Sequence, residues 1–261
     1  MQMEMLKKEL IDAGFRTETE NGSGGGLREI RVHRVDLSAP AEVKSSFESA
    51  LDGALDGMRG GESSASVDGC SSVLFFANSG SLGPLVPVGD LPDSEIFSAV
   101  SLNVSSFCVC VSSFLRWIKN TVEQDQKEDG GERTKLRVRV VNTSSLLAVQ
   151  PFNAFSLYAT GKAARDMFVR ACAEEMQAEE RMDIKFLNWA PGPLSTAMMD
   201  EILENCGDAK VRSEFRKMEE GGNILDPSMS AERLLSVLKA NSFSSGAHID
   251  FFDVNDKGVP I

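Results

Sequence analysis

The stretch Asn142-Thr-Ser-Ser145, followed twelve positions on by Leu157-Tyr-Ala-Thr-Gly-Lys162, decides the fold of this chain. It comes directly after the apolar strand pattern of residues 136–141, and a helical pattern runs from about residue 156 to 179. A strand that passes through a polar turn into a helix of crossover length is one unit of a parallel α/β sheet. Because ligands bind at the carboxyl ends of the strands in such sheets, these polar residues are predicted to line a site.

The same alternation of strands and helices extends along the rest of the chain. A continuous apolar run at residues 73–77 is predicted to be a strand buried on both faces. Further strands are expected at residues 30–35, 184–189 and 248–252, and helices at 2–13, 40–58, 93–122 and between 196 and 240, with loops at 22–26, 59–71 and 125–135. Residues 1–261 are therefore predicted to form a single α/β domain with a Rossmann-like parallel sheet and helices on both faces.

Composition excludes several classes of function. The chain has 42% hydrophobic and 25% charged residues, as globular domains do, and 27 basic against 39 acidic residues give a net charge of −12. Nucleic acids and anionic membranes attract the opposite balance, so we expect neither as a partner and favour a small-molecule ligand. The N-terminus lacks an apolar signal core, no apolar run reaches membrane-spanning length, and the five cysteines form no C-x-x-C pair. We therefore expect a cytoplasmic protein without a metal site.

Tyr158 and Lys162 are four positions apart, so on a helix they share one face. A phenol is a poor acid at neutral pH because its reference pKa is about 10, and an ammonium within about 4 to 6 Å lowers that pKa. A serine hydroxyl aimed at the same point can hold a carbonyl oxygen while the phenol delivers its proton. The spacing favours Ser145 as the serine that holds the carbonyl oxygen, and Ser144 as a residue of the turn. These residue types predict a carbonyl reductase.

Ser145, Tyr158 and Lys162, spaced by thirteen and four positions, resemble the catalytic triad of the short-chain dehydrogenase/reductase family. Asn103 matches the asparagine that completes a catalytic tetrad there, with a proton relay through water to the lysine. A bare Y-x-x-x-K is a weak signal. In order with Asn78, Gly80 and Pro191-Gly192, it becomes specific.

Four further segments are similar to the sepiapterin reductase branch of this family: residues 147–152, 161–167, 188–194 and 245–253. The resemblance implies NADPH-dependent reduction of a pterin side-chain carbonyl, and a homodimer. It implies that NADP(H) is bound by Asp36, Leu37, Asn78, Gly80, Tyr158, Lys162, Leu194, Ser195, Thr196 and Met199. It also implies that the substrate is bound by Ser145, Leu146, Tyr158, Gly192 and Asp250, where the Asp250 carboxylate accepts two N–H bonds from the pterin.

The chain departs from the family at its N-terminus. The family begins with a strand, a Gly-rich turn and a helix that receives the cofactor pyrophosphate, and this chain shows no counterpart. Gly22-Ser-Gly-Gly-Gly26 precedes an expected strand rather than following one, so we reject it as that turn. We therefore expect a domain that lacks its first βαβ portion, with impaired activity, through either an incomplete gene model or a shortened paralogue.

Two other functions stay open: a reductase for another ketone, and a non-catalytic paralogue that only dimerises. His33 and His248 lack nearby ligand partners in the sequence, so both histidines are expected to be structural.

Overall fold

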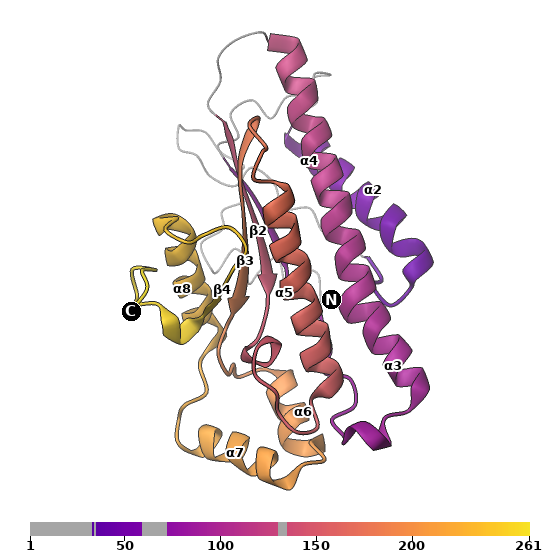
Figure 1. Cartoon of the computed structure of the whole chain (residues 1–261), viewed down its shortest axis with the longest axis vertical. Coiled ribbons are helices and arrows are strands. Elements are labelled where there is room, and N and C mark those ends of the chain that lie inside the picture. The colour runs from indigo at the N-terminus through magenta and orange to yellow at the C-terminus, as the bar shows by residue number, and fades with distance from the viewer. Residues whose placement is uncertain (1–32, 34, 59–71, 130–134) are drawn as a thin grey trace, which may run out of the picture.

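The computed structural model describes residues 33, 35–58, 72–129 and 135–261, and it contains a parallel four-stranded sheet (Figure 1). The strands lie in the order β1-β2-β3-β4, with every neighbouring pair parallel. Their bounds are β1 Ser72–Ala77, β2 Leu136–Thr143, β3 Met182–Ala190 and β4 Ala247–Asp250. The predicted parallel α/β sheet is confirmed. The expected helix at 2–13 and the loops at 22–26 and 59–71 lie outside the described residues, as does most of the expected strand at 30–35.

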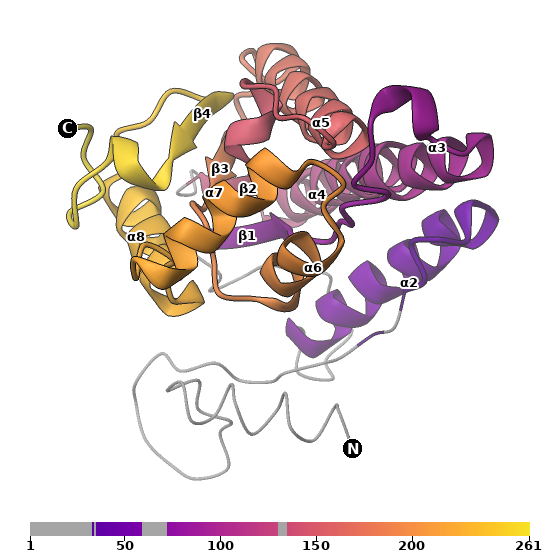
Figure 2. The same ribbon diagram turned by 90° about the horizontal axis from the view of Figure 1, so that it is seen from below.

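Helices cover both faces of the sheet. Figures 1 and 2 show α2 (Pro40–Met58), α4 (Phe107–Asp129) and α5 (Ser156–Glu175) on one face and α8 (Pro227–Ala240) on the other. Helices α6 (Ala197–Asn205) and α7 (Ala209–Glu220) lie beyond the carboxyl ends of the strands. The largest core cluster fills the space between the sheet and α4 and α5, with Val111, Phe114, Ile118, Val138 and Phe186 among its members. Helix α4 continues to Asp129, so the first part of the expected loop at 125–135 is helical instead.

The prediction that the first apolar run is buried on both faces is wrong. In β1, Val73, Phe75 and Ala77 pack against the core, whereas Leu74 is 46% and Phe76 is 44% exposed. The core on the opposite face is built by β2, β3, β4 and α8, and β1 contributes no residue to it. Strand β1 is thus an edge strand of the described sheet with one covered face, and an apolar run alone does not distinguish this from full burial.

The helices expected near residues 93–122 are confirmed, and the structure shows where one gives way to the next. Helix α3 (Asp93–Val100) is followed by a π-helical segment, η2 (Ser101–Ser106), before α4 begins. The Ser106 hydroxyl donates to the Ser101 carbonyl at 3.0 Å and lies 2.7 Å from the Leu37 carbonyl. A π turn widens the helix locally and is frequent at functional sites. Here it turns the buried Asn103 toward β1 and α5.

The helical stretch Asp93–Gln124 is long and apolar enough, by length and composition alone, to cross a membrane. We did not expect such a stretch from the short apolar runs of the sequence. Its apolar window is 39% buried within the protein, and Phe107, Val111 and Phe114 belong to the core cluster. A core helix of this kind passes the same test, so the stretch is weak evidence for a membrane span.

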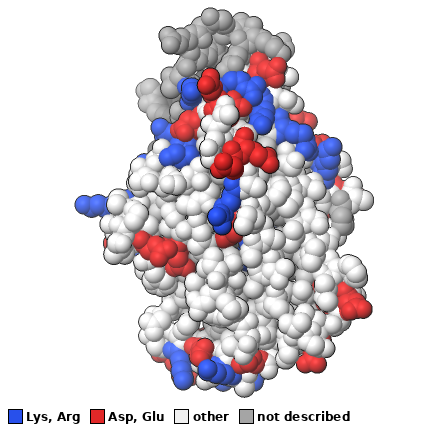
Figure 3. Space-filling view, viewed as in Figure 1, with Lys and Arg blue, Asp and Glu red and all other residues white. Residues whose placement is uncertain are grey.

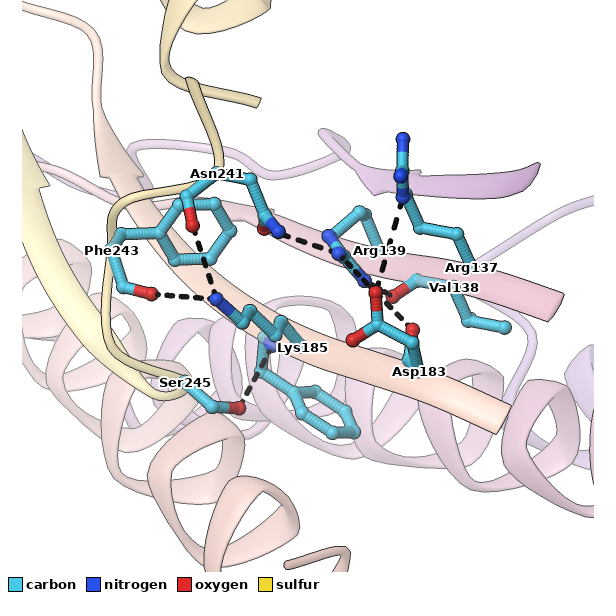
Figure 4. Close-up of polar contacts among 9 residues, drawn as sticks. Arg137, Val138, Arg139, Asp183, Lys185, Asn241, Phe243 and Ser245 are labelled. Atoms are coloured by element: carbon cyan, nitrogen blue, oxygen red, sulfur yellow. Dashed lines mark hydrogen bonds and ion pairs between the residues drawn. The ribbon is translucent and has the colours of Figure 1, made fainter. Parts of the chain in front are cut away.

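Two cations from the sheet hold the carboxyl end of α8 (Figure 4). Arg139, 1% exposed on β2, pairs with Asp183 at 2.7 Å and donates to the Asn241 side chain at 3.1 Å. Lys185 on β3 donates to the main-chain carbonyls of Asn241 and Phe243 at 3.1 and 3.2 Å. The last carbonyls of a helix lack partners within the helix and carry its negative partial charge. Arg139 and Lys185 place positive charge near that end and fix the residues that follow α8 to the sheet.

We predict that Lys185→Met lowers the free energy of unfolding by about 1.5 to 3 kcal/mol, because two carbonyls lose a charged donor. Urea unfolding measures the change. The control is Lys239→Met, which removes an exposed lysine from the last turn of the same helix and should change stability by less than about 0.5 kcal/mol. Equal effects of the two substitutions would contradict this account of the α8 anchor.

Candidate active site

The carboxyl end of β2 and the first turns of α5 bring Ser145, Tyr158 and Lys162 together. Helix α5 packs across β2 and β3, and its side chains at positions 158 and 162 face the loop after β2. The Lys162 ammonium donates to the Thr143 carbonyl at 2.5 Å and lies 5.5 Å from the centre of the Tyr158 ring. The Ser145 side chain is hydrogen-bonded to Tyr158. The three side chains therefore form one polar cluster at the end of β2.

The two neighbouring serines have different surroundings. Ser144 is 1% exposed and donates its hydroxyl to Asp166 at 2.5 Å, away from the tyrosine. Ser145 is half-buried, accepts the Leu147 N–H at 3.2 Å and contacts Tyr158. The structure thus places Ser145, and not Ser144, where a carbonyl oxygen could meet both hydroxyls. Leu146 follows as an exposed residue, 41% accessible, at the rim.

Burial sets the protonation of this cluster. It raises the pKa of Tyr158, and the Ser145 hydrogen bond and the charge of Arg165 oppose that rise. The pKa of Lys162 falls to about 7, mainly through burial and secondly through Arg165, while Asp166 opposes the fall. We expected Lys162 to bring the phenol pKa below its usual value. Burial outweighs the Ser145 hydrogen bond and the charge of Arg165, so the phenol stays protonated at neutral pH.

Arg165 is a site residue that the sequence analysis missed. Its side chain is 2% exposed, donates to the Asn103 carbonyl and, at 2.7 Å, to the Ser79 carbonyl, and lies 4.9 Å over the Phe107 ring. It therefore joins α5 to η2 and to the turn after β1. The one signal in the sequence is that Arg165 follows Lys162 by three residues, which places it near Lys162 on the next turn of the helix.

Asn103 lies between the turn after β1 and α5. Its side-chain amide exchanges two hydrogen bonds, each 3.0 Å long, with the main chain of Ser81. A Cβ at Gly161 would approach the Asn103 Cβ to 3.0 Å, so a glycine before Lys162 lets α5 lie close to η2. A Cβ at Gly80 would lie 3.2 Å from the Asn103 amide oxygen. The water relay to Lys162 stays a prediction.

Apart from Tyr158 and Lys162 on α5, the residues expected to bind the cofactor lie in three places. Asn78 is exposed and Gly80 contacts Asn103, both directly after β1. Asp36 accepts the Ser38 N–H at 2.9 Å at the start of α2, and the Leu37 carbonyl meets η2. After β3, Leu194 bridges to Leu225, Ser195 donates its N–H to the Leu225 carbonyl, Thr196 begins α6, and Met199 packs in an apolar cluster with Leu82, Leu85 and Phe155.

Gly192 lies in the turn after β3, and Asp250 ends the neighbouring strand β4. Gly192 has φ +79°, and a Cβ there would come within 2.9 Å of Leu225, so only glycine leaves this space open. The Asp250 carboxylate accepts the Phe252 N–H at 3.0 Å, and burial raises its pKa. One carboxylate oxygen thus caps the turn after β4. Among the residues that the structure describes, none donates a hydrogen bond to the second carboxylate oxygen.

The described residues fit one end of a nicotinamide cofactor. Lys162 and Tyr158 supply polar groups, and the space kept open at Gly192 would be filled by any Cβ. Within the described ranges no Gly-rich turn leads from a strand into a helix to receive a pyrophosphate. Among the same residues, no group of three or more His, Cys, Asp or Glu side chains could hold a metal ion.

A parallel α/β fold with Ser, Tyr and Lys at one strand end defines a class of oxidoreductase. The family described as short chain dehydrogenase matches residues 65–207. The chain belongs to the short-chain dehydrogenase family.

Several individual members of this family are similar to the chain in sequence. The chain is similar to sepiapterin reductase of Xenopus tropicalis, with 36% identity over 72% of this chain and 66% of that protein. It is also similar to sepiapterin reductase of Bos taurus, with 35% identity over 90% and 79%. A benzil reductase of Bacillus subtilis is 26% identical over 88% and 83%. For several relatives, the chain spans less than two thirds of their length. One example is the sepiapterin reductase of Rattus norvegicus, of which it covers 64%.

Solved structures support the fold. A levodione reductase is 19% identical with a TM-score of 0.58, covering 83% of this chain and 73% of that one. A xylitol dehydrogenase is 15% identical with a TM-score of 0.60, covering 83% and 76%. At such identities the likeness concerns the fold alone.

We predict that Lys162→Met flattens the dependence of stability on pH above neutrality. The folded-state pKa of Lys162 is about 7, against 10.5 for a free lysine. Between these values the unfolded chain holds a proton that the folded chain has released, so stability increases as the pH rises. One such group contributes a slope of up to about 1.4 kcal/mol per pH unit.

Urea unfolding across that pH range measures the slope for the wild type and the variant. Lys239→Met, which removes an exposed lysine, is expected to keep the wild-type slope. Parallel profiles of the wild type and Lys162→Met would contradict the assignment of a neutral lysine to the folded site.

Proposed function

We propose that this protein catalyses the NADPH-dependent reduction of a pterin side-chain carbonyl. The observation that carries the proposal is the cluster of Ser145, Tyr158 and Lys162 at the end of β2, with Asp250 at the end of β4 in the same sheet. The similarity to sepiapterin reductases supports a pterin as the substrate. NADP rather than NAD is proposed from the same similarity.

The residues of the cluster divide the chemistry among them. Ser145 donates a hydrogen bond to the substrate carbonyl oxygen and polarises it. Tyr158, which burial keeps protonated, donates its phenolic proton to that oxygen as negative charge develops. Lys162 and Arg165 stabilise the phenolate that remains, since opposite charges nearby favour the ionised form. The nicotinamide cofactor, when bound, supplies the hydride.

Asp250 fits the role of the pterin anchor. A carboxylate that has given one acceptor site to the Phe252 N–H retains further lone pairs. These can accept N–H bonds from the aminopyrimidine ring, and partial burial strengthens such bonds. With the ring held at β4, the side-chain carbonyl extends toward Ser145 and Tyr158.

A homodimer in the cytoplasm is part of the proposal. Figure 3 shows a broad uncharged face over α5 and the lower part of α4 and α3. Phe97, Val100 and Met167 are among the exposed apolar residues of these helices, at 76%, 40% and 58%. An uncharged face with exposed apolar side chains suits burial against a second copy.

The second candidate is a reductase for another ketone, which the likeness to benzil reductases favours. It uses the same three residues for proton transfer and makes no use of Asp250. The two candidates therefore differ in what a substitution at Asp250 does.

We predict that Tyr158→Phe abolishes carbonyl reduction and leaves NADPH binding nearly unchanged. The phenol is the proton donor, and the loss of turnover should exceed the roughly 10² to 10⁴ typical of general acid catalysis. Turnover is followed by NADPH absorbance and binding by calorimetry. A variant that keeps more than about a tenth of the wild-type turnover would rule out Tyr158 as the acid.

We predict that Asp250→Asn raises KM for sepiapterin by about tenfold or more and leaves KM for benzil unchanged. The amide keeps an oxygen for the Phe252 N–H but replaces the second acceptor oxygen with a donor. Steady-state kinetics with both substrates give the two values. Equal changes for both substrates would favour the second candidate.

A further inference from the structure

Three neighbouring strands carry a row of polar side chains beneath the active site. Asn142 on β2 is in register with Asn188 on β3, which is in register with His248 on β4. Residues in register on adjacent strands point to the same face of the sheet. Asn142 and Asn188 are fully buried, and the Asn142 amide donates to the Asn188 side chain at 2.9 Å. A polar row of this kind in the middle of a parallel sheet requires partners on the covering helix.

Asp166 on α5 is that partner. One carboxylate oxygen accepts the Ser144 hydroxyl at 2.5 Å and the Asn142 amide at 3.2 Å. The other lies 2.5 Å from Nδ1 of His248. The Asp166 main-chain carbonyl accepts the Asn188 amide at 3.3 Å. Asp166, 7% exposed, therefore contacts the carboxyl halves of β2, β3 and β4 at once.

Asp166 lies on the same face of α5 as the catalytic residues. Tyr158, Lys162 and Asp166 are spaced by four and four, so they follow one another along the helix face that meets the sheet. Burying a carboxylate is costly unless it is paired and hydrogen-bonded. Here the hydrogen bond from His248 meets that requirement, and the same contact raises the pKa of His248.

The contacts of Asp166 connect the proposed catalytic residues to the proposed pterin-binding residue. Ser144 directly precedes Ser145, the residue beside Tyr158. His248 precedes Asp250 by two residues on β4, so both side chains lie on the same side of the strand. We call the contacts from Ser144 through Asp166 to His248 the Asp166 bridge.

We propose that Asp166 is a positioning residue, which through His248 sets the place of the pterin-binding Asp250 relative to the catalytic Ser145. The proposal rests on the proposed function and goes beyond it, since that function assigns no part in binding or proton transfer to Ser144, Asp166 or His248. Reduction requires the carbonyl to lie in contact with Ser145 and Tyr158 while Asp250 holds the ring. A misplacement of about 1 Å costs about 10²-fold in rate. A shared carboxylate fixes β4 to β2 where the sheet pairing of β4 is only four residues long.

The test compares substitutions at the two ends of the bridge, with sepiapterin as the substrate that needs Asp250 and benzil as one that does not. His248→Leu removes the β4 end. His248→Asn restores it, because the asparagine amide nitrogen is joined to the same carbon as Nδ1 and can donate to Asp166. Ser144→Ala removes the β2 end. Its matched control is Ser230→Ala, a buried hydroxyl that bonds the Trp189 indole at 3.2 Å outside the bridge.

We expect His248→Leu to raise KM for sepiapterin by about tenfold or more and to leave benzil within about twofold. His248→Asn should return KM for sepiapterin close to the wild-type value. Ser144→Ala should lower kcat on both substrates by about tenfold, and Ser230→Ala should lower neither. Asp166→Asn, which keeps the volume of the side chain, should both raise KM for sepiapterin and lower kcat on both substrates. This variant replaces His248→Leu in the test if His248→Leu does not fold.

Equal losses on both substrates in His248→Leu, or no recovery in His248→Asn, would overturn the positioning role. Sepiapterin binding is titrated in parallel by fluorescence, so the test does not depend on turnover. A chain that binds sepiapterin without reducing it contradicts the reductase proposal alone, and the binding constants of His248→Leu and His248→Asn then decide on the bridge. Absence of sepiapterin binding in the wild type would overturn both.

Discussion

The packing of α5 against the carboxyl halves of β2 and β3 is the contact on which the site depends. One face of this helix carries Tyr158, Lys162 and Asp166 on successive turns, and each meets a different part of the sheet or its loops. The close approach at Gly161 brings the same helix against Asn103. A shift of α5 would therefore move the proton donor, its cation and the bridge together. This explains how one helix can order a site assembled from several segments of the chain.

Much of this arrangement could be predicted from the sequence, because apolar runs and helical spacing report how the chain alternates between sheet and helix. The apolar run of β1 could not show that only one face of the strand is covered. A strand covered on one face and a strand covered on both faces can have the same apolar composition. The π turn at Ser101–Ser106 left no mark either, because a single inserted residue preserves the apolar pattern on both sides of it. The Ser106 hydroxyl at the end of this turn contacts the Leu37 carbonyl, which is sixty-nine positions away in the sequence.

The site residues that sequence reasoning missed are charged residues next to the catalytic lysine. Arg165 and Asp166 were noted only as part of the similar segment 161–167, and His248 was expected to be structural. Only the packing of α5 brings Asp166 within 2.5 Å of His248, which is eighty-two positions away. The candidate catalytic residues Tyr158 and Lys162 could be found because they are only four positions apart. The residues that position them make contacts across the sheet, and local spacing carries no information on those.

Two cations beside one phenol have different consequences for catalysis. Lys162, with a pKa of about 7, is charged for only part of the time at neutral pH in the free chain. Burial also lowers the pKa of Arg165, but only to about 10, so the guanidinium stays charged. Arg165 is therefore the constant source of positive potential at Tyr158, and it is held by the Ser79 and Asn103 carbonyls rather than by a carboxylate that would cancel its charge. Because Arg165 also stabilises a phenolate at Tyr158, Lys162 could release its proton without leaving that phenolate unpaired, which the predicted relay requires.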